Sequence, residues 1–417
     1  MKRYKKYKQV NLPWLKEVPE HWEIKKVKFY FEITRGRVIS KDELDENGKY
    51  PVFSSQTENN GIMGYLNTYD FDEVNCITWT TDGENAGTTF LRSGKYNCTN
   101  ICGILFIKKE KIEEINLGYC NYIIGLGNKH TRRKDINGYK IMNNEMKRNI
   151  ILIPPLQEQT QISNFLDWKI GEIDRLVGLE KEKLSKIKLT KNKIIDRFIN
   201  LEKTKSIKLK FIGSFIKGKG ISRENLDKEG EYPVILYGDI YTKYNFSFSQ
   251  ISNKINYDIY NMSTKISKNT LLFTTSGETR EDIGKTVLYS GKDNVAIGGD
   301  ILSFVVNNKE IDSKYLMYYL NSTKSLEYKY IYGRGDIIVH ISEQKLKEIK
   351  IKYPNIDIQR KVVNLIDKKL SDIDKFILKT TQQINYLQEL KQSLISDVVT
   401  GKIDIRDIEI PEKYRRD

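Results

Sequence analysis

Three histidines are the residues of this chain best suited to general acid–base chemistry. His21 lies in "VPEHWEI", His130 in the basic stretch "NKHTRRK" and His340 in "RGDIIVHIS". A catalytic base needs a second side chain that positions it, and no such partner is evident beside any of the three. Contact with a phosphate or a base edge is the more ordinary role for histidines in basic surroundings.

Paired acidic residues could bind a metal ion or transfer protons. Asp82 and Glu84 lie in "TTDGEN", whereas the similar stretch "TTSGET" has Ser276 in place of the aspartate and keeps Glu278. A turn at the end of a strand explains the glycine and the small hydroxyl residues equally well. We therefore favour recognition contacts over catalysis at both stretches.

The cysteines raise the question of a zinc site. They all lie in one segment, at Cys76, Cys98, Cys102 and Cys120. Only one spacing is short, and the first three correspond in the second half of the chain to Thr270, Val295 and Gly299. We therefore predict no metal site and expect free thiols in a reducing compartment.

Sequence motifs of catalysis are also missing. The chain has no G-x-x-x-x-G-K-[ST] loop for phosphates, no G-x-G-x-x-G after a strand and no H-E-x-x-H. The aromatic methyltransferase motif N-P-P-Y is absent as well. These absences predict that the chain has no catalytic residues of its own.

Basic residues outnumber acidic ones, with 70 Lys and Arg against 55 Asp and Glu, which gives a net charge of +15. Such a balance favours an anionic partner, either nucleic acid or a membrane surface. The alternative is a lysine-rich composition inherited from an AT-rich genome, which would carry no information about partners.

Two short motifs place cations around a glycine. Arg35 and Arg37 flank Gly36, and two lysines flank Gly218 at the matching place. A glycine between cations would let the backbone approach phosphates, and arginine can also bond guanine. A solvated surface is the alternative for any single charge run, but recurrence favours DNA contact. The predicted DNA-binding residues are Arg35, Arg37, Lys41, Thr81, Lys95, Lys129, His130, Arg132, Arg133, Lys217, Lys219, Arg223, Ser276, Arg280, Lys292, Arg334 and His340.

The two halves of the chain are copies of each other. "PLQEQTQISNFLDWKIGEIDRL" (155–176) recurs as "NIDIQRKVVNLIDKKLSDIDKF" (355–376), at an offset of 200 residues. "KVKFYFEITRGRVISKDELDENGKYPV" (26–52) recurs as "KLKFIGSFIKGKGISRENLDKEGEYPV" (208–234). The chain is therefore a tandem duplication of a globular region followed by a long helix. In the globular regions, "NCITWTT", "ICGILFI", "NTLLFTT" and "DILSFVV" predict strands, and "SKYLMYYLNS" predicts a short helix.

Apolar residues recur at heptad core positions in both long segments. Polar residues interrupt the pattern at matching places, Glu180 with Thr380 and Lys191 with Lys391. The narrow apolar stripe favours packing of helix on helix, although packing of each helix on its own globular region stays open. The predicted seam and partner-binding residues are Gln157, Glu158, Gln159, Leu166, Ile173, Glu180, Ile187, Ile366, Ile373, Thr380 and Leu387.

These patterns predict an α+β fold with tandem strand-rich globular domains. The expected segments are a first domain at 1–155, a spacer helix at 156–203, a second domain at 204–354, a second helix at 355–400 and a tail at 401–417. About forty helical residues span about 60 Å. An antiparallel coiled coil with pseudo-twofold symmetry would hold the two domains at a fixed distance and inverted, which suits duplex DNA.

The chain is expected to be cytoplasmic. No window approaches the roughly 20 apolar residues that span a bilayer. The start "MKRYKKYKQVNLPW" also lacks the apolar core of a signal peptide.

Three motifs carry a resemblance to a known family. They are "VPEHWEIKKVK" (18–28), "IPPLQEQTQI" (153–162) and "VVTGKID" (398–404). Together they resemble the specificity subunits of type I restriction-modification enzymes over nearly the whole chain. The second helix departs from the pattern, because Asn355 and Ile358 replace the second proline and the glutamate of the first.

The resemblance implies that each globular region is a target recognition domain for one half of a bipartite DNA sequence. The paired helices would set the gap and dock two methyltransferase subunits, and motor-nuclease subunits would join that core. S-adenosylmethionine, ATP and magnesium would then bind those partners. One alternative is a fused nuclease or methyltransferase, which would need an additional domain. Another is a coiled-coil scaffold or repressor without modification partners, for which the globular regions are large.

Overall fold

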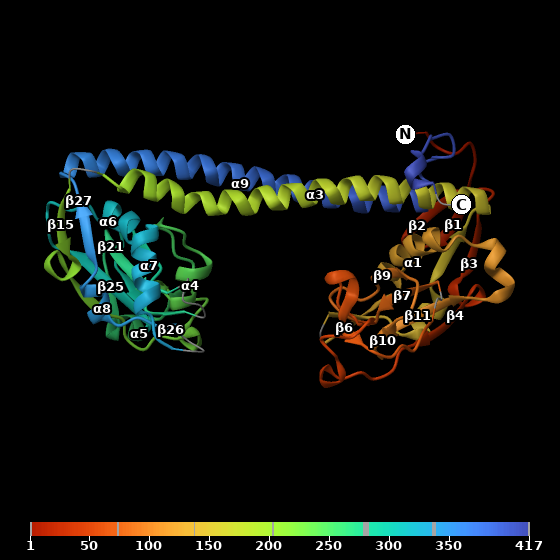
Figure 1. Cartoon of the computed structure of the whole chain (residues 1–417), viewed down its shortest axis with the longest axis horizontal. Coiled ribbons are helices and arrows are strands. Elements are labelled where there is room, and N and C mark those ends of the chain that lie inside the picture. Colours follow the sequence, from red (N-terminus) through yellow and green to blue (C-terminus); the bar gives the residue numbers. More distant parts are fainter. Residues whose placement is uncertain are drawn as a thin grey trace. The chain divides into compact units, whose positions relative to one another are not determined.

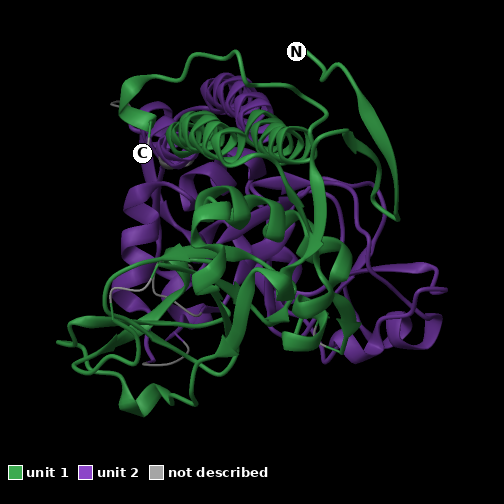
Figure 2. Ribbon diagram, turned by 90° about the vertical axis from the view of Figure 1, so that its right-hand side faces the viewer, with its two compact units in different colours: residues 1–180, 382–417 green, residues 181–381 purple. Residues whose placement is uncertain are grey.

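The computed structural model describes residues 2–72, 75–136, 138–201, 204–277, 283–335 and 339–415. The chain divides into two compact units, shown in Figure 2. Unit 1 comprises residues 1–180 and 382–417, and unit 2 comprises residues 181–381. The boundaries fall inside the long helices α3 (Leu156–Ile199) and α9 (Ile356–Val399). Each unit therefore contains one globular region and one half of each long helix.

The globular region of unit 1 contains a four-stranded antiparallel sheet in the order β4-β11-β7-β9. Its members are β4 (Phe31–Arg35), β7 (Cys76–Thr80), β9 (Thr89–Arg92) and β11 (Cys102–Ile107). The predicted strands in "NCITWTT" and "ICGILFI" are thereby confirmed. In Figure 1, helix α1 (Leu117–Thr131) lies between this sheet and α3.

The other strands of unit 1 form small sheets around this one. Parallel pairing joins β10 (Asn97–Cys98) to β5 (Tyr50–Phe53), which pairs with β6 (Ile62–Leu66). At the base of α3, β3 (Glu23–Lys26) pairs with β14 (Ile150–Ile153). The remaining elements are β1 (Tyr7–Leu12), β2 (Leu15–Pro19), β8 (Asp82–Gly83), β12 (Arg133–Asp135), β13 (Gly138–Lys140) and α2 (Asn143–Arg148).

Unit 2 repeats this plan. Its main sheet has the order β16-β25-β21-β23-β18, made of β16 (Gly213–Lys217), β18 (Ser247–Phe248), β21 (Thr270–Thr274), β23 (Thr286–Tyr289) and β25 (Ile301–Val306). The predictions for "NTLLFTT" and "DILSFVV" are confirmed, as is the helix α6 (Ser313–Leu320). The other elements are β15 (Lys205–Lys208), β17 (Tyr232–Ile235), α4 (Tyr237–Thr242), β19 (Lys254–Ile255), α5 (Tyr257–Met262), β20 (Thr264–Ile266), β22 (Ser276–Gly277), β24 (Val295–Ile297), α7 (Thr323–Tyr332), β26 (Val339–His340), α8 (Glu343–Lys347) and β27 (Lys350–Tyr353).

The base of each long helix is anchored to its globular region by the same side chains. Gln159 is fully buried, accepts a hydrogen bond from the N–H of Asn116 at 2.9 Å and donates to the carbonyls of Glu114 and Pro154. In unit 2, Gln359 makes the equivalent three bonds to Asp312, Glu310 and Pro354. These repeated contacts tie each globular region to its helix.

A second repeated contact lies about two helical turns further along each long helix. The hydroxyl of Tyr122 donates to Asp167 Oδ1 at 2.7 Å, and that of Tyr318 donates to Asp367 Oδ1 at 2.6 Å. Both bonds connect the first helix after the main sheet to the long helix. Partly buried side-chain bonds of this kind restrict the orientation of one helix on the other.

Several heptad positions of the long helices are less exposed than their neighbours. On α9, Ile384 is 7% exposed, whereas Tyr386 is 64% exposed. Within unit 1, Lys391 Nζ lies 2.7 Å from Asp174 Oδ1. Within unit 2, Lys191 makes the corresponding ion pair with Asp374. Each lysine that interrupts a heptad is therefore paired with an aspartate of the other long helix in the same unit.

The chain termini cover the beginning of α3 in unit 1. Buried Glu158 accepts hydrogen bonds from Tyr4 and from Trp22 Nε1, and His21 Nε2 lies 2.8 Å from its other carboxylate oxygen. Gly401, with φ at +72°, ends α9 and lies against Pro19 so closely that a Cβ would stand 2.4 Å from it. Across the part of the chain that the structure describes, no helix is both long and apolar enough to cross a membrane.

Candidate nucleic-acid interface

A short antiparallel ladder in unit 1 brings two charged residues together at the end of the main sheet. It pairs β8 with β13, so that Asp82 stands opposite Lys140. Lys140 Nζ lies 2.9 Å from Asp82 Oδ1, and the Thr81 hydroxyl donates to the other carboxylate oxygen at 2.5 Å. Burial raises the pKa of Asp82, but the bonds from Thr81 and Lys140 outweigh it and hold the pKa below its usual value. The aspartate is therefore ionised at neutral pH.

The corresponding ladder in unit 2 pairs β22 with β26 and sets Ser276 opposite His340. Ser276 Oγ lies 2.8 Å from His340 Nδ1. The backbone of His340 also exchanges two hydrogen bonds with Arg334. Three residues predicted separately to bind DNA, Ser276, Arg334 and His340, are thus brought together. Arg280, a fourth predicted residue nearby in sequence, lies outside the described residues.

Each ladder is followed by a loop. In both units one backbone hydrogen bond joins the two ends of this loop. The N–H of Gly87 donates to the carbonyl of Thr80 at 2.8 Å, and Gly284 donates to Thr274 at 2.9 Å. Both glycines have positive φ, +94° and +69°. A left-handed conformation of this kind is readily adopted by glycine and rarely by other residues.

A buried side chain then holds each of these glycines. Asn128 Nδ2 donates to the carbonyl of Gly87 at 2.8 Å. In unit 2 the same role belongs to Lys329, whose Nζ lies 2.6 Å from the Gly284 carbonyl and also bonds Thr286 and the Leu320 carbonyl. Both Asn128 and Lys329 are fully buried. The loops are therefore fixed at their closing end from inside each unit.

Lys329 should make the stability of unit 2 depend on pH. Burial lowers its pKa from 10.5 to about 7. Between these values the unfolded chain binds the proton and the folded chain does not, so the free energy of unfolding should rise with pH. In Lys329→Met this rise should be smaller, as measured by urea unfolding at about pH 7 and about pH 9.5. An equal rise in both proteins would contradict this role for Lys329.

The glycine between two cations packs against protein backbone in both units. A Cβ on Gly36 would stand 1.9 Å from the carbonyl oxygen of Cys98, and one on Gly218 would stand 2.0 Å from that of Gly298. Close packing against backbone therefore explains why glycine stands at both positions, and the approach of phosphate to these glycines stays a prediction. The cations beside them remain candidates, because they lie at the ends of β4 and β16.

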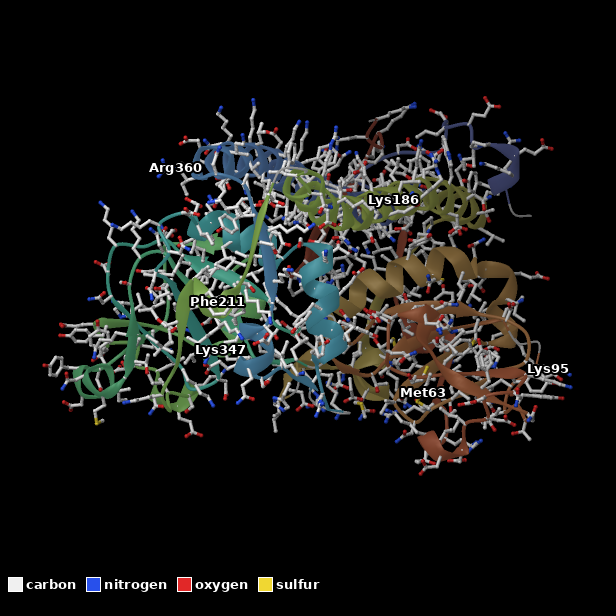
Figure 3. All side chains as sticks on the ribbon, turned by 60° about the vertical axis from the view of Figure 1, so that its left-hand side comes forward. Met63, Lys95, Lys186, Phe211, Lys347 and Arg360 are labelled. Carbon is white, nitrogen blue, oxygen red and sulfur yellow. The ribbon has the colours of Figure 1, made fainter. Side chains whose placement is uncertain are left out.

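The cations beside Gly36 have side-chain partners, whereas among the described residues no ion pair involves those beside Gly218. Arg35 Nε donates to Asn143 Oδ1 at 2.9 Å, and Arg37 forms ion pairs with Asp70 and Glu43, both at 3.2 Å. Lys217 and Lys219 are exposed, and so are Lys41, Arg223 and Lys292. Lys95, labelled in Figure 3, pairs with Asp72 at 3.5 Å. Exposed cations of this kind are suited to contact phosphate.

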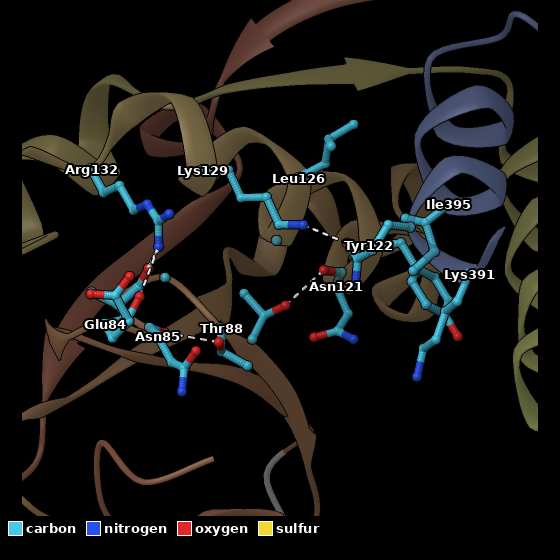
Figure 4. A pocket seen from close by; sticks show the side chains of 15 residues that line it. Glu84, Asn85, Thr88, Asn121, Tyr122, Leu126, Lys129, Arg132, Lys391 and Ile395 are labelled. Atoms are coloured by element: carbon cyan, nitrogen blue, oxygen red, sulfur yellow. Dashed lines mark hydrogen bonds between the residues drawn. The ribbon is translucent and has the colours of Figure 1, made fainter. Parts of the chain in front are cut away.

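The basic stretch that begins in the last turn of α1 is partly directed inward. Lys129 and Arg132 line a pocket of about 540 Å³ in unit 1, seen in Figure 4. Arg132 donates to the carbonyls of Glu84 and Ala86, and Lys129 to Gln392. The ring of His130 stacks on that of Trp14 with centroids 5.1 Å apart. Arg133 remains exposed and lies 3.3 Å from Glu145.

The predicted seam and partner-binding residues fall into three environments. Gln157 is exposed, whereas Glu158 and Gln159 are buried and engaged within unit 1. Leu166, Ile173, Ile366 and Thr380 are buried, at 0%, 8%, 0% and 3% exposed. Glu180, Ile187, Ile373 and Leu387 are half-buried. Ile358, which replaces the glutamate at the beginning of α9, is 40% exposed.

The site contains residues that the sequence did not single out. Lys140 and Asn143 were missed in unit 1, as were Tyr237 and Tyr241, whose hydroxyls donate to the Ser276 carbonyl in unit 2. Lys140 could have been found from the sequence, because it lies 200 residues before His340 and 200 residues is the repeat offset. Nothing in the sequence signalled the two tyrosines, since no α-helix corresponding to α4 occurs between β5 and β6 among the described residues of unit 1.

Candidate metal ligands do not gather in the described ranges. Among those residues, no group of three or more His, Cys, Asp or Glu side chains could hold a metal ion. The four cysteines are free and buried, and Cys76 Sγ lies 2.9 Å from the Tyr96 hydroxyl. Burial raises the pKa of Cys76 to about 11, so its thiol is protonated at neutral pH.

Comparison with known proteins assigns the chain to a family. Residues 19–189 and 201–389 each match the type I restriction modification DNA specificity domain. The chain belongs to the family of type I restriction-modification specificity subunits, with two such domains in tandem. The two matches correspond to the two copies found in the sequence.

Several individual proteins are similar to this chain. The type I restriction enzyme MpnII specificity subunit of Mycoplasma pneumoniae is 35% identical over 150 residues, which cover 35% of this chain and 43% of that protein. A sequence from Methanocaldococcus jannaschii named for the MjaX type I restriction enzyme is 22% identical over 94% of this chain and 95% of its own length. The chain thus spans less than half the length of the M. pneumoniae relative.

A solved structure has the same fold. A chain from a structure of the complex assembly and conformational transition of a type I R-M system matches with a TM-score of 0.69. The match covers 93% of this chain and 99% of that chain at 12% identity.

Proposed function

We propose that this chain is the DNA-recognition subunit of a type I restriction-modification complex, with each globular region recognising one half of a bipartite target. The observation that carries the proposal is the duplication of one family domain. Each copy ends its main sheet in a polar ladder, Asp82 with Lys140 or Ser276 with His340, near exposed cations. Polar groups on a fixed frame suit base recognition, and exposed cations suit phosphate contact.

We further propose that α3 and α9 form an antiparallel coiled coil with pseudo-twofold symmetry, which would set the gap between the half-sites. Two ion pairs support this proposal, Lys391 with Asp174 within unit 1 and Lys191 with Asp374 within unit 2. Both lysines and both aspartates are 200 residues apart, so the second pair repeats the first with the helices exchanged. Such polar residues at core positions can specify register and orientation at some cost in stability.

Catalysis would belong to partner chains. In this proposal two methyltransferase subunits dock on the long helices, and motor-nuclease subunits join them. S-adenosylmethionine, ATP and magnesium would bind those partners, and the chain would act in the cytoplasm. Exposed apolar residues on α3 and α9, such as Leu179 at 49% and Leu378 at 60%, are consistent with such docking, because solvent-facing helix positions are usually polar.

The main rival is a free-standing DNA-binding scaffold or repressor. It shares the basic surface but requires no methyltransferase. Selection of bound duplexes from a random DNA library by the purified chain–methyltransferase complex separates the two. Two short conserved stretches at a fixed separation, seen only with the methyltransferase present, would support the proposal. A single contiguous motif bound equally well by the chain alone would favour the rival.

A further inference from the structure

We infer that the ladder pairs, Asp82 with Lys140 in unit 1 and Ser276 with His340 in unit 2, determine which bases each half-site contains. The inference rests on the proposed function and adds the recognising residues to it. Both pairs occupy the same position of the repeated fold, at the first residue of β8 or β22 and at the last residue of β13 or β26. They differ completely in chemistry.

Each ladder pair is held by a backbone frame, which consists of the hydrogen-bonded segments beside the pair and the closed loop after it. This frame is the same in both units. Beside each pair, the N–H of Ile141 donates to the Thr81 carbonyl at 2.9 Å, and Ile341 donates to Thr275 at 2.9 Å. Both isoleucines are buried, at 0% and 2% exposed. The loop after each pair is closed by Gly87 or Gly284, which Asn128 or Lys329 holds from inside. A base-recognising residue needs such a support, because a loosely held side chain discriminates poorly.

The side chains on this frame differ between the units. Lys140 is 28% and Asp82 33% exposed, so both have atoms available to a ligand. In unit 2 the exposed member is His340, and Ser276 is half-buried. The loops differ as well, with "TDGENA" between Thr80 and Gly87 but "TSGETREDI" between Thr274 and Gly284. The same backbone frame with different polar side chains is the arrangement expected for two domains that recognise different sequences.

The chemistry of the pairs points to particular base edges. Lysine donates to guanine O6 and N7, and aspartate accepts from cytosine N4 in the major groove. Asp82 and Lys140 together therefore suit a G·C pair in the first half-site. Serine and neutral histidine each donate or accept a hydrogen bond, so the second pair suits a different base pair. Arg35 near Asp82, and Arg334 beside His340, would contribute positive charge for the adjacent phosphates.

The test transplants one pair onto the other frame. In a host that lacks other adenine methylation, Asp82→Ser with Lys140→His should change the bases of the first half-site and leave the second half-site and the gap unchanged. The reciprocal variant, Ser276→Asp with His340→Lys, should change only the second half-site. The modified motif is determined by sequencing modified bases. The intact half-site then reports that the chain is folded and bound to its partners.

A matched control replaces another lysine–carboxylate ion pair of unit 1 by histidine and serine. Lys111 Nζ lies 2.7 Å from Glu114 Oε1, on a 3-10 helix (Lys109–Glu114) away from the ladder. Lys111→His with Glu114→Ser should leave the motif unchanged.

Three results would overturn the inference. One is an unchanged motif in both ladder variants, with the wild-type motif bipartite. Another is an altered motif in the control. The third is loss of all modification in both reciprocal variants although each still melts within a few degrees of wild type. Failure of the proposed function is distinguishable, because the wild-type chain would then produce no bipartite motif at all.

Discussion

Replacing Gln359 by methionine is expected to lower the free energy of unfolding of unit 2 by about 3 kcal/mol. The glutamine is fully buried and makes three hydrogen bonds, with the Asp312 N–H at 2.9 Å, the Glu310 carbonyl at 2.7 Å and the Pro354 carbonyl at 2.9 Å. Methionine fills a similar volume but leaves these three backbone groups without their partner. Leaving a buried polar group unpaired costs more than the net value of the bond itself.

The measurement is urea unfolding of the full chain, with hydrogen exchange to locate the opened segment. The Asp312 amide should lose its protection in Gln359→Met. The matched control is Arg360→Met, which makes the same replacement at the next residue of α9, exposed and labelled in Figure 3. Equal stability of the two variants would show that Gln359 is not an anchor. Gln159→Met should have the same effect on unit 1, because its three bonds are equivalent.

The second large effect is expected for DNA affinity. The double variant Lys217→Ala with Lys219→Ala should bind DNA about tenfold or more weakly at about 0.1 M salt. Each lost phosphate contact should also reduce the slope of log K against log salt concentration by about 0.9. Both lysines are exposed at the end of β16, where no ion pair holds either of them among the described residues.

The control for this variant is Lys309→Ala. Lys309 is equally exposed but lies next to Glu310, at the base of α9 where Gln359 is anchored. Fluorescence anisotropy across a salt series measures both affinity and slope. If the double variant and the control have the same slope as wild type, then Lys217 and Lys219 do not contact phosphate.

The architecture was predictable where local pattern and burial agree. Heptad spacing after Pro155 and Pro354 indicated the long helices, and runs of aromatic and β-branched residues indicated the central strands of both sheets. Helix α1 was not predicted, because Gly118, Gly125 and Gly127 lower helix propensity. In the structure a Cβ would stand 2.2 Å from the Ser163 side chain at Gly118 and 2.4 Å from the Asn149 side chain at Gly127, so these neighbours would have to move. Packing against neighbouring elements outweighs propensity here.

The candidate site was less predictable, because a sequence shows charge but not the direction of a side chain. Arg132 looks like a DNA contact in "KHTRRK", yet it bonds two carbonyls and lies 3.8 Å from the ring centroid of Tyr139. Ser276 and His340 were proposed from different motifs, and only the β22–β26 pairing brings them together. Residues distant in sequence become one site through strand register, which local pattern does not specify.

The departure of the second helix from the family motif has a structural counterpart. Glu158 accepts hydrogen bonds from Tyr4 and Trp22 and contacts His21. All three belong to the N-terminal segment that covers the beginning of α3 in unit 1. Ile358 stands at the equivalent place on α9 and is 40% exposed. A glutamate there would have no such donors among the described residues of unit 2. The motif therefore differs where the surroundings differ, while the anchoring glutamine is the same in both helices.

Sequencing of modified bases would show whether the chain recognises a two-part DNA sequence for a methyltransferase. The chain would be co-expressed with the methyltransferase of the same genome in a host without other adenine methylation. We expect modified adenines in two short stretches separated by an unspecified gap of constant length. A stable complex that leaves the DNA unmodified, or one that modifies a single contiguous motif, would contradict it.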